Sequence, residues 1–186
     1  ISRGLVGSEM CIRDRAYHGL NFYESFGDLA YTTYGHAVGL RDLGPTMAPM
    51  NAYLTIMGIE TLALRMEKHV ANAEVVANYL HNHAKVSWVS YAGLEESNYF
   101  HLAKKYLPKG AGSVFTFGIK GGYDAGVKFV EKCQLLSHLA NIGDTRSLVL
   151  HPASTTHRQL TETQRISAGA GDDVIRLSIG LETVED

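Results

Sequence analysis

The alternation of apolar and polar positions is clearest near the end of the chain, where it predicts a buried strand. Over residues 174–179, aliphatic side chains alternate with Val174, Arg176 and Ser178, which is the period-2 pattern of a β-strand. A long cation on an inner strand loses its hydration unless an anion meets it. Two interpretations stay open at this point: Arg176 pairs with an Asp or Glu of the protein, or its planar fork receives a carboxylate from outside.

A helical period dominates the middle of the chain. From Pro49, apolar side chains recur every three to four residues and predict one long amphipathic helix over about residues 50–83. Gly58 lowers the helix propensity and indicates a close packing contact or a kink. A helix of this length is about 50 Å long, more than the width of a small domain. We therefore expect it to connect two domains.

The segments after this helix alternate between strand-like and helix-like patterns. Strands are predicted at residues 86–91, 113–120, 135–140 and 147–151, and helices at 98–107, 124–133 and 161–168. Short turns between some of the strands favour an at least partly antiparallel sheet. The predicted fold class is α/β, an α/β sandwich in which helices cover a mostly antiparallel sheet.

The N-terminal third is less regular. Residues 16–45 are rich in Gly and aromatic side chains, and we predict irregular structure with a possible short strand or helical turn near residues 28–40. Residues 1–15, ISRGLVGSEMCIRDR, have no persistent periodicity and resemble translated adapter sequence. We interpret them as a non-native leader, and the alternative is a flexible N-terminal arm.

Composition excludes several classes of partner. The longest apolar runs are far short of a membrane span, and no signal peptide is visible, so we expect no membrane partner. A net charge of −2 without a basic run argues against nucleic acid. Two cysteines, Cys11 and Cys133, cannot form a disulfide framework, so we expect a cytoplasmic protein.

The familiar catalytic motifs are absent from the sequence. The nine histidines form no HExxH pattern and no Cys pair accompanies them, so we predict no metal site. GxSxG, GxGxxG and the Walker pattern are also missing. Two polar segments remain, residues 141–147 and 151–157, with sharp turns at Gly143 and Pro152. Beside the Arg176 strand, they would form a site for a small anionic molecule.

These same residues carry a family resemblance. The segments NIGDTRSLVLHPASTTH at 141–157 and IRLSIGLETVED at 175–186 closely resemble the C-terminal part of the Cys/Met-metabolism family of pyridoxal-phosphate enzymes. Further matches are LRDLG at 40–44, NAYLTIMGIETLALRMEKHV at 51–70, VSWVSYAGL at 86–94 and AKKYLPKGAGSVFTFGIKGG at 103–122. The resemblance covers about residues 16–186 and is closest to the members that add sulfide to O-acetylhomoserine.

The resemblance implies a fold-type-I enzyme and a division of the chain. Residues 16–84 would be the end of the large domain and the connecting helix, and residues 85–186 the small C-terminal domain. By resemblance, Arg176 binds the substrate α-carboxylate and Thr156 helps to line that site. Asn141 stands where related lyases have a Ser, and an Asn there is similar to the sulfhydrylases. The resemblance favours an external carboxylate as the partner of Arg176.

The implied activity belongs to a longer protein. The resemblance implies γ-replacement of acetate by sulfide or methanethiol, with pyridoxal phosphate as cofactor and a homotetramer at full length. In the family the cofactor Lys lies in an SxTK-like segment, which is absent here, so we expect this chain alone to be inactive. Alternatives are a cystathionine γ-synthase or a methionine or cystathionine γ-lyase and, from another class, a non-catalytic domain. The eight lysines outside such a segment are Lys68, Lys85, Lys104, Lys105, Lys109, Lys120, Lys128 and Lys132.

Overall fold

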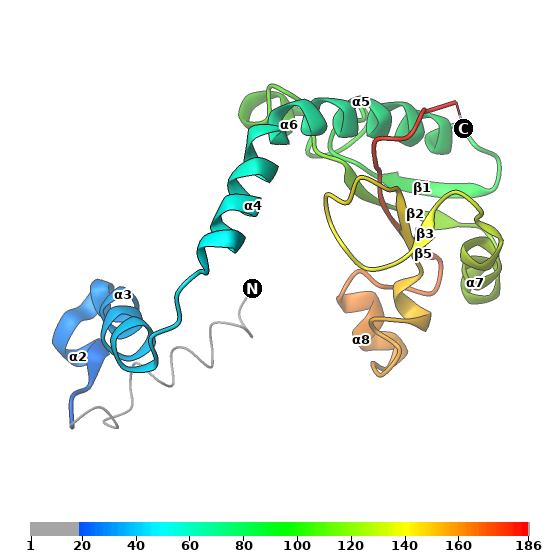
Figure 1. The fold of residues 1–186 in the computed structure, drawn as a ribbon. Helices are drawn as coiled ribbons and strands as arrows, with labels where there is room; N and C mark the ends of the chain where they lie inside the picture. Colours follow the sequence, from blue (N-terminus) through cyan, green and yellow to red (C-terminus); the bar gives the residue numbers. More distant parts are fainter. Residues whose placement is uncertain (1–18, 186) are drawn as a thin grey trace. The chain divides into compact units, whose positions relative to one another are not determined.

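The computed structural model describes residues 19–185 and contains two compact units (Figure 1). The first unit ends at Met57, and the second begins at Gly58. The interpretation of residues 1–15 as a non-native leader lies outside the described residues. Between residues 19 and 185, no helix is both long enough and apolar enough to cross a membrane.

The first unit is helical between Phe22 and Leu43. It contains α2 (Phe22–Phe26), the 3-10 helix η1 (Gly27–Leu29), α3 (Ala30–Tyr34) and the π-helix η2 (Gly35–Leu43). The prediction of irregular structure was therefore wrong for residues 22–43, and of the two alternatives near residues 28–40 the helical one is confirmed and the strand is not. Phe22 is buried against Ala30, and its ring meets that of Tyr34 edge-on with 5.2 Å between the centroids. Aromatic packing thus stabilises short helices in which glycines weaken the intrinsic propensity.

The single helix predicted over residues 50–83 is two helices in the structure. They are α4 (Pro49–Glu60) and α5 (Leu62–His81), and Thr61 interrupts the run between them. The Arg65 guanidinium donates from Nη2 to the carbonyl oxygen of Gly58 at 2.6 Å and from Nε to the Thr61 hydroxyl at 3.2 Å. These bonds satisfy backbone and side-chain acceptors at the interruption between the two helices. Within the described residues an added Cβ at Gly58 would meet nothing within 4 Å, so the close packing contact expected there is not found.

The side chains of α4 have little cover. None of its residues is buried within the described part of the chain. Its exposed apolar side chains are Met50, Tyr53, Leu54, Ile56, Met57 and Ile59. A helix that is apolar on all sides normally lies inside a protein, so α4 lacks the surroundings that its composition requires.

A five-stranded sheet forms the centre of the second unit. Its strands are β1 (Val86–Ser90), β2 (Val114–Ile119), β5 (Val174–Ser178), β4 (Leu148–Leu150) and β3 (Ser137–His138), in that spatial order. All neighbours pair antiparallel except β3 and β4, which are parallel. The predicted mostly antiparallel sheet is confirmed, and β5 is its central strand.

Helices cover one face of this sheet. Ile175 and Leu177 of β5 point into the core and pack with Phe117 of β2. From the helices, Ala73 and Ala77 of α5 and Val130 of α7 (Gly122–Lys132) join the same cluster. Figure 1 shows α5 running over the sheet. The aliphatic face predicted for residues 174–179 is therefore buried, which directs Arg176 to the opposite face.

Three shorter elements complete the unit. Helix α6 (Phe100–Tyr106) precedes β2, the 3-10 helix η3 (Pro152–Ser154) follows β4, and α8 (Glu162–Ser167) lies before β5. Thr161 begins α8 with a capping box, in which its side chain and that of Gln164 each bind the other's backbone N–H. The connection from η3 to β5 therefore contains one short helix with a defined start.

Candidate functional site

Arg176 extends from the centre of β5 on the face opposite the helical core, and its side chain is half-buried. Antiparallel pairing sets Thr116 of β2 on one side of it and Leu150 of β4 on the other. Ser90 of β1 pairs in turn with Thr116. Directly paired residues project to the same face of a sheet, so a row of two hydroxyls leads to the guanidinium. The sequence analysis did not single out Thr116 or Ser90, because strand pairing is not visible in one chain segment.

The acidic side chains nearest to β5 in the sequence all bind other partners. Asp172 pairs with Arg165, at 2.9 Å between Oδ1 and Nη2. Asp173 accepts a hydrogen bond from the Trp88 indole at 3.0 Å. Glu182 accepts from the backbone N–H and the hydroxyl of Ser147, at 2.6 and 2.8 Å. Each carboxylate is therefore satisfied without the strand's own guanidinium.

Within residues 19–185, Arg176 has no carboxylate partner. Its one hydrogen bond there runs from Nη2 to the carbonyl oxygen of Asn141, at 3.4 Å. This bond leaves most of the guanidinium's five N–H groups without a protein acceptor in the described residues. Among residues 19–185 the structure therefore contradicts the interpretation of Arg176 as one half of an internal ion pair, and its planar donor group remains available for an anion.

The turn that contains Asn141 is held by its own local bonds. The Asn141 side chain accepts from the backbone N–H of Ile142 at 2.9 Å, so it contacts Arg176 through its carbonyl rather than its amide. Gly143 adopts a positive φ of 75° at the turn. Asp144 accepts hydrogen bonds from the side chain and backbone of Arg146, which lower the pKa of that carboxyl below its usual value. The structure thus brings Asn141 to Arg176.

The loop that contains Thr156 lies on the surface. The Thr156 hydroxyl is 2.8 Å from Nδ1 of the neighbouring His157. In the described part of the chain it makes no hydrogen bond to Arg176. Its predicted place in the carboxylate site stays a prediction.

His151 fixes the base of that loop and was not predicted to do so. The ring is fully buried, with Nδ1 2.9 Å from the Ser154 hydroxyl and Nε2 2.9 Å from the carbonyl oxygen of Asp172. Gly126 of α7 gives it room, because a Cβ there would lie 2.7 Å from the ring. His151 therefore ties the end of β4 to the start of β5. A histidine beside a proline gives no sequence signal for this role.

The other end of β5 is bound by helix α5. His69 Nδ1 lies 2.6 Å from the carbonyl oxygen of Ile179, and Asn72 donates to the carbonyl oxygens of Gly180 and Glu182. Gly180 passes so close to Ser147 that a Cβ would lie 2.5 Å from the Ser147 nitrogen. Buried polar groups thus hold both ends of the strand that carries Arg176.

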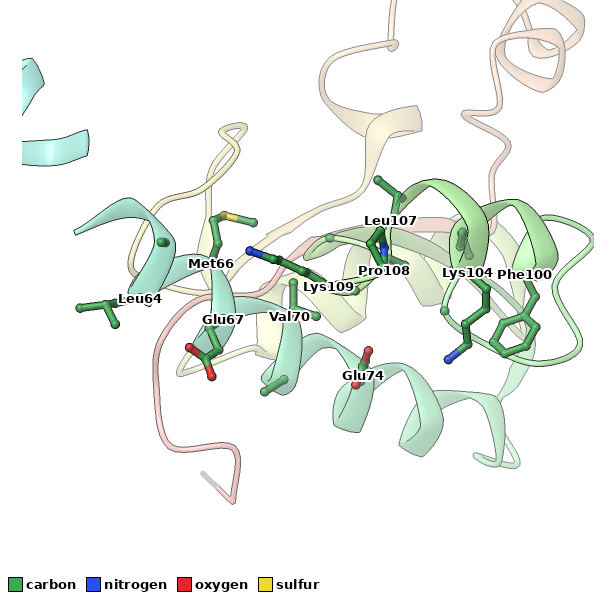
Figure 2. Close-up of a pocket in the computed structure, with 18 residues that line it drawn as sticks. Leu64, Met66, Glu67, Val70, Glu74, Phe100, Lys104, Leu107, Pro108 and Lys109 are labelled. Atoms are coloured by element: carbon green, nitrogen blue, oxygen red, sulfur yellow. The ribbon is translucent and has the colours of Figure 1, made fainter. Parts of the chain in front are cut away.

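A groove of about 1000 Å³ lies elsewhere in the second unit (Figure 2). Helix α5 forms one wall, with Val70 and Glu74, and α6 with the loop after it forms the other. The glycine-rich loop closes tightly, since a Cβ on Gly110 would overlap Val70. The lining includes none of Arg176, Asn141 and Thr156. This groove therefore belongs to a different part of the surface from the guanidinium.

No residue described here fits the role of a covalently bound lysine. All eight lysines are exposed. A lysine that forms a Schiff base works in a sheltered site where its pKa is lowered. None of the lysines between residues 19 and 185 therefore lies in such a sheltered site. Among residues 19–185 there is also no group of three or more His, Cys, Asp or Glu placed to hold a metal ion.

The chain is similar in sequence to known enzymes. Residues 10–186 match a family model described as Cys/Met metabolism PLP-dependent enzyme. O-acetyl-L-homoserine sulfhydrylase 1 of Thermus thermophilus is 46% identical over 170 residues, and homocysteine synthase of Schizosaccharomyces pombe is 50% identical over 170 residues. Both alignments cover 91% of this chain but only 40% of the relative. The chain thus spans well under half the length of these relatives.

A solved structure is similar as well. It is a putative O-acetylhomoserine (thiol)-lyase from Campylobacter jejuni, with a TM-score of 0.77 and 43% sequence identity. The match covers 93% of this chain and 41% of that one. The solved protein contains an N'-pyridoxyl-lysine-5'-monophosphate. Both the sequence and the structural matches therefore correspond to part of a larger molecule.

Proposed function

Because this chain belongs to the Cys/Met metabolism PLP-dependent enzyme family, we propose that it is the C-terminal part of an enzyme that makes homocysteine from O-acetylhomoserine and sulfide. The fold is that of the C-terminal part of a fold-type-I enzyme, as the Campylobacter jejuni structure shows. The names of the relatives support the substrates. Methanethiol in place of sulfide would give methionine by the same replacement.

The observation that carries the proposal is the available guanidinium of Arg176. The three acidic residues nearest to β5 in the sequence bind other groups, and within the described residues the Arg176 side chain makes one hydrogen bond, to the carbonyl of Asn141. A bidentate Arg–carboxylate pair is strong and directional. The α-carboxylate of an amino acid is an anion of matching size and shape. Arg176 therefore serves as the substrate's carboxylate site in this proposal, with Asn141 and Thr156 beside it.

This chain contributes binding and orientation. Pyridoxal phosphate supplies an electron sink when it is bound in the parent enzyme. Arg176 holds one end of the amino acid, and the strand that bears it is fixed at both ends by His151 and His69. Holding a substrate in a productive orientation accounts for a large part of many rate enhancements. We expect the chain alone to be inactive, because its exposed lysines do not replace the cofactor lysine.

The alternatives are separated by the nucleophile. A cystathionine γ-synthase would use cysteine in place of sulfide, and a γ-lyase would eliminate without a nucleophile. The relatives are sulfhydrylases and homocysteine synthases, and their names do not favour a γ-synthase or a γ-lyase. The family match likewise does not favour a non-catalytic domain. Steady-state assays of the full-length enzyme with sulfide, with cysteine and with neither nucleophile separate the three enzymatic functions.

The exposed apolar surface of α4 indicates that another part of the full-length protein covers this helix. We place the full-length enzyme in the cytoplasm as a homotetramer, in which the rest of the parent covers α4. Six large apolar side chains on this helix are exposed within the described residues. Such a surface is typical of one that meets another part of a protein. Sedimentation velocity of the full-length enzyme tests the oligomeric state.

The carboxylate role is tested with Arg176→Ala in the full-length enzyme. Charge-assisted hydrogen bonds contribute about 1.5–3 kcal/mol, so we expect the KM for O-acetylhomoserine to rise by about 10- to 100-fold. Arg176→Lys keeps the charge but loses the bidentate fork, and we expect an intermediate KM. The absorbance of the bound cofactor serves as a control for folding. An unchanged KM in Arg176→Ala would contradict the proposed role.

A further inference from the structure

Two polar side chains of α5 bind the segment that leaves β5. His69 is fully buried, and its Nδ1 lies 2.6 Å from the carbonyl oxygen of Ile179. Asn72 donates through Nδ2 to the carbonyl oxygens of Gly180 at 3.1 Å and Glu182 at 2.8 Å. Residues three apart on a helix share one face. One turn of α5 therefore binds three carbonyl oxygens in the four residues that follow β5, those of Ile179, Gly180 and Glu182.

The imidazole of His69 does more than fill space. Its Nε2 has no hydrogen-bond partner among the described residues, and an unpaired buried nitrogen is unfavourable. An aliphatic side chain of similar size would avoid that penalty. The advantage of histidine at this position therefore lies in the bond that Nδ1 makes to Ile179.

The remaining contacts of α5 with the sheet carry little directional information. Ala73 and Ala77 are fully buried in the core and let the helix approach closely. Apolar contacts fill space but do not specify a position along the aliphatic surface. Hydrogen bonds do, because they weaken steeply when distance or angle changes. The bonds from His69 and Asn72 therefore fix the register of α5 against β5.

We propose that His69 and Asn72 are positioning residues for the carboxylate site. Arg176 lies three residues before Ile179 on the same strand. By fixing α5 on the end of β5, the two side chains hold the guanidinium at a set place relative to the helix. This inference rests on the proposed function, in which Arg176 receives the substrate carboxylate. Small displacements of a group that orients substrate cause large losses of rate.

A double-mutant cycle in the full-length enzyme tests the proposal. The variants are His69→Leu, Arg176→Ala and the two combined, and the measured quantity is the KM for O-acetylhomoserine. We expect His69→Leu to raise KM by about tenfold with the cofactor absorbance unchanged. In the Arg176→Ala background, the same substitution should leave KM within roughly twofold, because residues that act through one another are not additive.

Two matched variants separate positioning from folding. His69→Asn keeps an N–H donor near the position of Nδ1 and should return KM to within roughly threefold of the unsubstituted enzyme. Ser87→Ala removes a different side-chain bond to the sheet backbone, from the Ser87 hydroxyl to the Gly118 carbonyl at 3.0 Å, and should leave KM unchanged. If His69→Leu does not fold, Asn72→Ser takes its place in the cycle with the same expectation.

The outcomes distinguish this inference from the proposed function. An unchanged KM in His69→Leu, with KM raised in Arg176→Ala, overturns the positioning role and leaves the proposed function standing. Equal increases of KM in both backgrounds show that His69 does not act through Arg176 and also overturn it. If Arg176→Ala itself leaves KM unchanged, the proposed function fails, and the positioning role fails with it.

Discussion

Ile56 on α4 and Ile175 on β5 are the same type of residue in opposite surroundings. Ile56 is 55% exposed, whereas Ile175 is 0% exposed. Both segments are rich in apolar residues, but they distribute them differently. Strand β5 concentrates its aliphatic residues on one face, which the second unit covers with α5 and α7. Helix α4 has apolar side chains on all sides and no buried residue in the described part of the chain.

The comparison shows that a region buries its apolar side chains according to how they are distributed around the helix or strand, and not according to how many there are. The second unit covers both faces of β5 from its own residues, since Val174 and Ser178 are buried as well as Ile175 and Leu177. A helix without a polar face needs cover all round. The second unit therefore has a core of its own, whereas α4 depends on surroundings that the described residues do not provide.

The largest expected effect comes from making one substitution in both regions of this chain. Ile175→Ala removes a fully buried side chain and should lower the free energy of unfolding by about 2–5 kcal/mol. Ile56→Ala changes an exposed side chain and should alter it by no more than about 0.5 kcal/mol. Urea unfolding followed by circular dichroism measures both. Equal losses would show that α4 is covered as well as β5 is.

A second prediction uses pH to sharpen the contrast. Burial, with a smaller contribution from the negative charge of Glu74, raises the pKa of Tyr91 from 10.0 to about 12. In the unfolded chain this tyrosine ionises near pH 10. The stabilisation that the un-ionised Tyr91 side chain gives the folded state is therefore complete below pH 10, and it is lost as the pH rises toward 12. The expected loss in the free energy of unfolding is up to about 2 kcal/mol.

The matching variant for this pH effect is Tyr91→Phe. It removes the ionisation together with the hydrogen bond from the Tyr91 hydroxyl to the Gly112 carbonyl at 3.0 Å. Its unfolding free energy should fall less steeply between pH 10 and 12 than that of the unsubstituted chain. Urea unfolding at several pH values gives both slopes, and equal slopes would contradict the assignment to Tyr91.

The smallest expected effect on stability comes from a charge on α4. Leu54 is 60% exposed, so Leu54→Lys should change the free energy of unfolding of this chain by less than about 0.5 kcal/mol. It should nevertheless reduce self-association at high concentration, because it interrupts the exposed apolar surface. Sedimentation velocity measures this change. A marked loss of stability would mean that α4 packs within the chain.

Local patterns were sufficient for much of the second unit. The alternating pattern predicted both β5 and β2 as strands, and it predicted that the aliphatic face of β5 is buried. The interruption at Thr61 was not predicted, because it is accompanied by bonds from the Arg65 side chain to Gly58 and Thr61 that no apolar periodicity records. The helices between Phe22 and Leu43 were missed because ring packing outweighs the low propensity of glycine there.

The site divides in the same way. The sequence pointed to Arg176 through the conflict between an inner strand and a charged side chain. The sequence could not show whether an acidic side chain was available to pair with Arg176, because the partners of Asp172 and Asp173 come from α8 and β1. His69 and His151 were also missed as supports of β5. Their acceptors lie in segments far apart in the chain, and no short-range pattern records such pairings.

The position of Trp88 gives the molecule a built-in optical probe. It is the chain's single tryptophan, and its indole lies over Gly118 in the row next to that of Thr116 and Arg176. A Cβ at residue 118 would lie 2.2 Å from the indole nitrogen, so only glycine leaves the ring room to rest there. When the indole is excited selectively over the ten tyrosines, the emission therefore originates at one point on the sheet surface that bears the guanidinium. Changes in polarity at that surface are readable in solution without attaching a dye.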